Sequence, residues 1–109
     1  MLWLTDLREF IIDLLTFVEQ QIVLAQTDPT AHQAATVAEC DHAIGCIKAR
    51  LAHKEYEQAQ AMLVFSDIYS SSWHSEWLSV ANSPQDKFLT AAAELLSGAR
   101  KLREHFSRL

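Results

Sequence analysis

The stretch SSSWHSEWLSV, residues 70–80, places three serines before two tryptophans four residues apart. It decides how the third helical segment of the chain ends. If a helix continues through the serines, Trp73 and Trp77 extend the apolar stripe that begins at Ala59 and Met62. Serines inside a helix hydrogen-bond to the preceding turn and bend it, so the stretch predicts a long third helix with a kink near residues 70–72. The alternative is a break, with Ser72 capping a short last helix.

Apolar residues recur at helical spacing along the rest of the chain, and no segment alternates as a strand does. We expect helices over about residues 4–26, 30–53 and 84–107, with a turn at 53–55 before the third helix. The pattern therefore predicts an all-α fold, a single-domain antiparallel four-helix bundle (up-down-up-down) over residues 1–109. The expected core positions of the first, second and last of these helices are Leu7, Ile11, Leu14, Val18, Ile22 and Ala25; Val37, Cys40, Ile44, Ile47 and Leu51; and Phe88, Ala92, Leu95, Ala99, Leu102 and Phe106.

Two short motifs mark helix starts. In TDPT, residues 27–30, Thr27 or Asp28 caps a helix whose first residue is Pro29. In NSPQD, residues 82–86, we expect Ser83 to cap and Pro84 to follow it.

The apolar runs and the cysteines indicate in which cellular compartment the protein resides. The longest purely apolar run, residues 61–65, is far shorter than the roughly 18–20 residues that a membrane-spanning helix needs. Asp6 and Glu9 stand where a secretory signal carries basic and then apolar residues. Cys40 and Cys46 lie about 240° apart around one helix, so they cannot bridge each other. We expect a cytoplasmic protein with reduced thiols, Cys40 in the core and Cys46 half exposed.

Charge is distributed unevenly. Residues 1–47 hold one basic residue against seven acidic ones, a net charge of −6, within a chain whose total is −5. Such an acidic body argues against nucleic acid, whose binding needs a cationic surface, and it favours a basic protein partner. The candidate partner-binding carboxylates are Asp6, Glu9, Asp13, Glu39 and Asp41.

Apolar side chains offer further candidates for an interface. Trp73 and Trp77 either fill the wide end of the helical core or anchor a partner protein. The pattern also allows one ring to face the core and the other to face a partner. Several apolar residues lie away from the main stripes of the first and third helices, which indicates a homodimer or docking surface, or else single exposed side chains. These dimer candidates are Ile12, Val23, Val64, Phe65 and Ile68.

Metal and catalytic alternatives rest on short spacings. His42 and Cys46 share one helical face, and His53 lies two turns further on, which is the start of a zinc site but short of four ligands. Arg100 and His105 spell Arg-x4-His in the last helix, which resembles the signature of HEPN-domain ribonucleases. That resemblance implies two such helices meeting across a dimer, with the arginine and histidine acting on RNA.

No glycine-rich phosphate loop, Gly-x-Ser-x-Gly elbow or Cys-x-x-Cys motif occurs in the sequence, so we expect no enzyme activity and no cofactor. The leading hypothesis is a small acidic protein-binding module, an inhibitor, immunity or chaperone-like protein whose partner is basic. A HEPN-like dimeric ribonuclease using Arg100 and His105 and a purely structural homodimeric scaffold are the alternatives.

Overall fold

The computed structural model describes the backbone of residues 2–52 and 71–108 and the side chains of residues 8–50 and 74–108. All regular structure in this part of the chain is helical, as predicted: α1 (Leu2–Thr27), α2 (Pro29–Ala52), α4 (Ser71–Ser79), the 3₁₀ helix η1 (Val80–Asn82) and α5 (Gln85–Ser107). The three long helices agree with the predicted ranges to within two residues at each end.

Helices α1 and α2 form a tight hairpin around a single connecting residue, Asp28. The backbone N–H of Ala31 donates to Asp28 Oδ1 over 3.3 Å, and the N–H of Asp28 donates to the carbonyl oxygen of Leu24 over 3.0 Å. Asp28 thus caps α2 while closing α1, and Pro29 takes the first helical position, where its missing N–H costs nothing. Of the two predicted caps for this helix, Asp28 is the one that forms.

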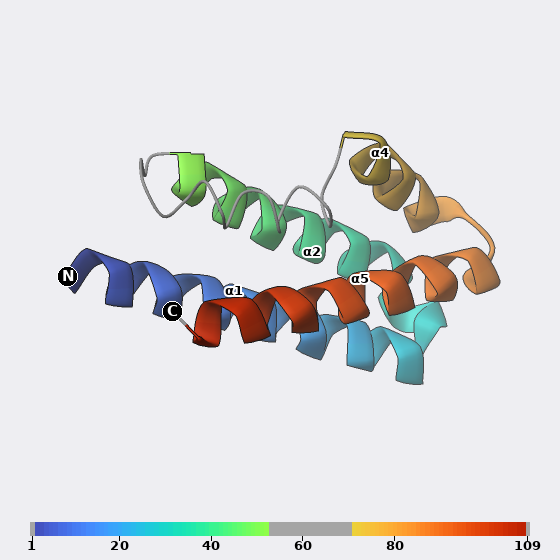
Figure 1. Ribbon diagram of the computed structural model, residues 1–109. Coiled ribbons are helices and arrows are strands. Elements are labelled where there is room, and N and C mark those ends of the chain that lie inside the picture. The colour runs from blue at the N-terminus through green and yellow to red at the C-terminus, as the bar shows by residue number, and fades with distance from the viewer. Residues whose placement is uncertain (1, 53–70, 109) are drawn as a thin grey trace.

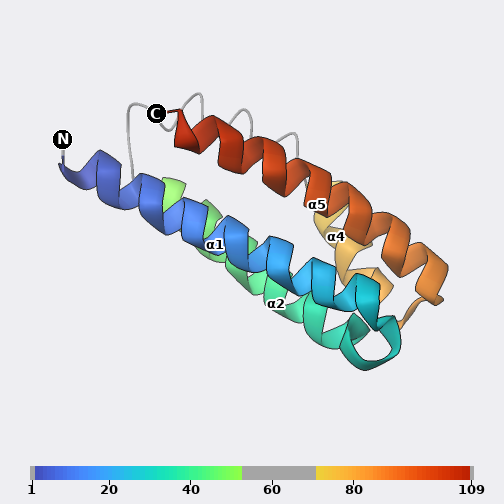
Figure 2. The same ribbon diagram turned by 90° about the horizontal axis from the view of Figure 1, so that it is seen from below.

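Figure 2 shows α1 lying between α2 and α5, and both views place the chain's N-terminus and C-terminus at the same end (Figures 1 and 2). Helices α1 and α5 therefore run antiparallel. Helix α4 packs against α2 near the opposite end of the molecule (Figure 1). This arrangement places one long side of α1 along α5 and leaves another side of α1 facing solvent.

The core follows the predicted stripes closely. Every predicted core residue of α5 is buried, and so is every one of α2 whose side chain is described. In α1, Ile11, Val18, Ile22 and Ala25 are buried as predicted, whereas Leu14 is only partly buried and Leu15 takes its place in the core. The buried set also includes Ala43, Trp77, Val80 and Leu96.

The connection between α4 and α5 is tied to the start of α2. Gln33 donates from Nε2 to the carbonyl oxygens of Val80 and Ser83, over 2.9 and 2.7 Å. The predicted Ser83 cap of α5 is wrong: the Ser83 hydroxyl donates back to the carbonyl oxygen of Ser79 over 3.0 Å, and α5 begins after Pro84 without a side-chain cap. Gln33 therefore ties η1 and the residue after it to α2.

Several predictions fall outside the described residues. These are the turn at 53–55, most of the third helix, His53, and the dimer candidates Val64, Phe65 and Ile68. The kink near 70–72 lies at the edge of the described residues, where α4 starts at Ser71. Asp6 and Trp73 lie on described helices, but their side chains do not belong to the described part.

The α1 segment Arg8–Thr27 is long and apolar enough to cross a membrane by length and composition, and an 18-residue window within it has a mean hydropathy of 1.2. The sequence-based expectation of no membrane-spanning helix required an uninterrupted apolar run, whereas mean hydropathy tolerates a few charged residues. A core helix of a soluble protein and a signal sequence near the N-terminus satisfy the same test, and 28% of that window is buried inside the chain. One such helix is weak evidence for a membrane span.

Candidate functional site

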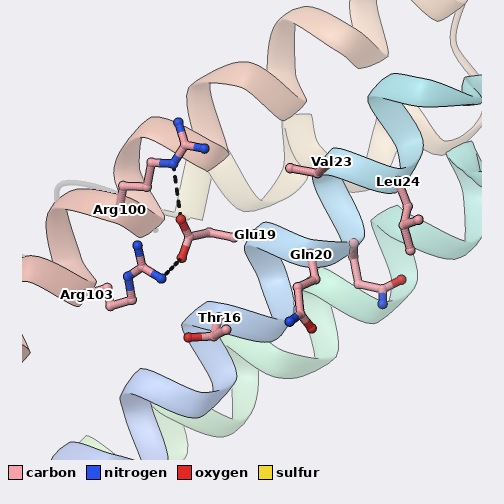
Figure 3. A pocket seen from close by; sticks show the side chains of 8 residues that line it. Thr16, Glu19, Gln20, Val23, Leu24, Arg100 and Arg103 are labelled. Atoms are coloured by element: carbon pink, nitrogen blue, oxygen red, sulfur yellow. Dashed lines mark hydrogen bonds and ion pairs between the residues drawn. The ribbon is translucent and has the colours of Figure 1, made fainter.

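The strongest electrostatic feature of the described structure is a buried carboxylate between α1 and α5. Glu19 projects from α1 toward two arginines of α5 (Figure 3). Arg100 donates from Nε to Glu19 Oε1 over 3.1 Å, and Arg103 Nη1 lies 2.7 Å from Glu19 Oε2. The Glu19 side chain is only 11% exposed, so its charge needs these counterions.

The two arginine contacts differ in kind. Oε1 of Glu19 accepts a hydrogen bond, whereas the buried Oε2 accepts none among the described residues and contacts Arg103 as an ion pair only. The side chains of Arg100 and Arg103 remain 58% and 40% exposed. Each guanidinium carries five N–H groups, so most of these donors stay free of protein acceptors within the described part of the chain.

A groove of about 590 Å³ opens beside this triad, between α1 and α5. Figure 3 shows its wall: Thr16, Gln20, Val23 and Leu24 follow one another along α1, while the arginines stand opposite. Val23 and Leu24 are 47% and 49% exposed, and they are two of the three exposed large hydrophobic residues in the described structure. The lining residues are Thr16, Glu19, Gln20, Gln21, Val23, Leu24, Arg100 and Arg103.

A second hollow, of about 410 Å³, lies on the other side of the arginines and includes Ile12. Ile12, Thr16, Glu19 and Val23 are spaced by four, three and four residues, so they form one stripe of α1. Two of the dimer candidates, Ile12 and Val23, therefore lie along the α1–α5 side of the molecule rather than being scattered.

The predicted partner-binding carboxylates separate into two groups. Glu9, Asp13 and Glu39 are exposed on the α1–α2 hairpin and make no ion pair with other described residues. We call these three the acidic hairpin set. Asp41 instead lies 2.6 Å from His74 Nε2, a contact that links α2 to α4. Its charge is directed toward another helix of the same chain.

Trp77 lies in the core, with 1% of its surface exposed. Its indole N–H donates to the carbonyl oxygen of Val37 over 3.1 Å, and its ring lies 6.2 Å from that of Phe88. This is the core alternative of the two that the sequence left open, and a partner protein has no access to the ring in this conformation.

The structure brings together two of the three residues predicted as zinc ligands. Cys46 Sγ and His42 Nε2 lie 3.7 Å apart on the exposed side of α2, while His53 is outside the described residues. No group of three or more potential ligands forms in the described structure. Both cysteines are free, Cys40 buried and Cys46 half-buried, as the sequence predicts.

The Arg-x4-His pair does not share a face in the described structure. A spacing of five residues separates Arg100 from His105 by about 140° around α5. Arg100 points to Glu19, and the His105 ring contacts the edge of Phe106 at 5.5 Å between centroids.

Glu19, Arg103 and Gln33 are the residues that the sequence interpretation did not single out. Glu19 directly follows Val18 of the core stripe and lies three residues after Thr16, so it stands at the border of the buried face. That border position was the available signal for a paired carboxylate. Its partners were not predictable, because they depend on where α5 crosses α1.

No protein-family model matches the chain, and neither the curated proteins nor the solved structures yield a significant match.

Proposed function

We propose that this chain is a small acidic intracellular protein-binding module whose partner is a basic protein, in the manner of an inhibitor, immunity or chaperone-like regulatory protein. The observation that carries the proposal is an asymmetry in charge pairing. The exposed carboxylates of the acidic hairpin set have no cationic partner among the described residues. They are available to a partner's lysines and arginines.

The arginines of α5, by contrast, each contact a carboxylate of the same chain. Arg100 and Arg103 share Glu19, and Arg108 pairs with Glu104. A nucleic-acid surface needs several cations that face successive phosphates, and the Glu19 cluster keeps a net charge of only +1, so this pairing weighs against nucleic acid and against a ribonuclease centred on Arg100. Complementary charge speeds association and selects the partner, which suits an acidic module that meets a basic surface.

The fold assumed in this proposal is the antiparallel up-down-up-down four-helix bundle expected from the sequence. Three long helices of matching length and the antiparallel pairing of α1 with both neighbours support it.

The test is affinity purification of the tagged full-length protein from its native cells at low salt, followed by mass spectrometry and light scattering. We expect one basic protein in a fixed ratio, released as salt is raised above the physiological range. A protein that elutes only as its own dimer, without a basic partner, would refute this function and favour the homodimeric scaffold.

A further inference from the structure

The α1–α5 groove combines three features that binding a basic protein at the acidic hairpin set does not require. It holds two arginines, a buried acid that positions them, and two exposed apolar side chains. We propose that this groove binds a small organic carboxylate with an apolar body, such as a medium-chain alkyl carboxylate. The site is separate from the acidic hairpin set, so it does not depend on the function proposed above.

Local charge argues for one anion. Glu19 and its two arginines sum to a net charge of +1 in a chain whose total is −5. A monoanion would bring this cluster to neutrality, whereas a cation would meet two guanidinium groups. Carboxylates bind well to guanidinium because two parallel N–H groups match two oxygens.

Glu19 determines which donors face the ligand. It engages Nε of Arg100 and Nη1 of Arg103, which leaves the terminal nitrogens of Arg100 and one terminal nitrogen of Arg103 for an incoming carboxylate. Figure 3 shows both guanidinium groups gathered around the same carboxylate.

The α1 wall of the groove, opposite the arginines, offers contacts for the apolar body of the ligand. Val23 is 47% exposed and lies in the same α1 stripe as Glu19, while Leu24 adds a second exposed side chain at the groove edge. The volume of about 590 Å³ falls in the range of small-molecule pockets, roughly 300–1,000 Å³. An alkyl chain covering these residues would remove apolar surface from water on both sides.

The experiment titrates three probes into the full-length protein, each below its micellar concentration, and follows binding by two-dimensional NMR. Octanoate has both features, acetate lacks the apolar body, and octanol lacks the charge. We expect saturable one-to-one binding of octanoate, with shifts at Val23, Arg100 and Arg103, and affinities at least about tenfold weaker for acetate and octanol. Equal binding of octanol and octanoate, or no saturable binding of octanoate, would overturn the proposal.

Charge variants separate this site from a general attraction. Arg103→Gln should weaken octanoate binding at least about tenfold, since it removes a charge-assisted hydrogen bond. Lys101→Gln removes the same charge from an exposed residue outside the groove and should change the affinity less than twofold. Equal effects of these two variants would overturn the proposal.

Glu19→Gln gives a result that a purely structural role for the arginines does not predict. It raises the local charge from +1 to +2 and frees both guanidinium groups, so octanoate should bind several-fold more tightly. Weaker binding by Glu19→Gln in a variant that NMR shows to be folded would contradict the assigned charge balance.

Discussion

The indole N–H of Trp77 donates a hydrogen bond to the backbone carbonyl oxygen of Val37, and this contact joins α4 to α2 through the core. The ring also packs near Phe88 of α5, so one side chain touches elements from three parts of the chain. Together with the Asp41–His74 pair, Trp77 attaches α4 to α2.

Trp77→Phe should therefore destabilise the protein by about 2–3 kcal/mol, through lost packing volume and the lost hydrogen bond. Urea denaturation followed by circular dichroism measures this. Leu78→Ala is the matched control, because Leu78 is the next residue of α4 but 44% exposed, and its change should stay within about 0.5 kcal/mol. Similar losses in both variants would show that Trp77 is not a core residue.

The two cysteines should differ in reactivity. Cys46 is half-buried near His42, whereas Cys40 is buried and its thiol donates to the carbonyl oxygen of Val18 over 3.9 Å. Titration with Ellman's reagent at pH 8 should modify one thiol per native chain and two in denaturant. Cys46→Ser should abolish the native reaction, and rapid modification of two native thiols would contradict the burial of Cys40.

Alkaline pH should destabilise the fold through Cys40. Burial, with a smaller contribution from the charge of Glu39, raises the pKa of the Cys40 thiol from 9.0 to about 12. The folded state then binds more protons than the unfolded state between these values, so this contribution to stability is complete below pH 9 and is lost as pH rises toward 12.

The loss should approach about 1.4 kcal/mol per pH unit within that window, on top of the titration of other groups. Denaturation at a series of pH values measures it, with Cys40→Ala as the comparison. The variant starts less stable but should show a shallower alkaline slope. Parallel slopes in both proteins would assign the alkaline sensitivity elsewhere.

The Glu19 triad should behave as a compensated buried charge. Arg100→Gln with Arg103→Gln leaves Glu19 without a counterion and should cost about 1–3 kcal/mol, less than a fully buried pair because the arginines are partly exposed. Adding Glu19→Leu removes the orphaned charge and should recover most of that loss. If the triple variant is no more stable than the double variant, the buried charge is not the cause.

Much of the fold was predictable because the evidence for it is local. Alternating steps of three and four residues fixed the buried faces of α2 and α5, and Asp28 with Pro29 marked the hairpin. The Ser83 cap failed for a tertiary reason: Gln33, fifty residues earlier, holds the Ser83 carbonyl, and the hydroxyl turns back to Ser79.

The α1–α5 groove could be predicted only in part. Ile12 and Val23 stood out because they depart from the core stripe of α1, and the structure places both along α5. The pairing of Glu19 with Arg100 and Arg103 depends on where α5 crosses α1, and Arg100 lies 81 residues after Glu19 in the sequence. No local pattern encodes that crossing.

The most direct test of the proposed function reverses the charge of one set of acidic residues at a time. One variant changes the acidic hairpin set to lysine, and the control changes three exposed acids of α4 and α5, which also lack a described ion pair. Both alter the net charge equally. The substitutions are Glu9→Lys, Asp13→Lys and Glu39→Lys in the first variant, and Glu76→Lys, Asp86→Lys and Glu94→Lys in the control.

The measurement is the dissociation constant of each variant for the co-purified basic partner, at two salt concentrations. We predict that the hairpin variant loses at least about a hundredfold in affinity at low salt and that the difference shrinks at high salt, while the control loses far less. Equal losses in the two variants, or unchanged binding by the hairpin variant, would contradict the proposal that the acidic hairpin set binds the partner.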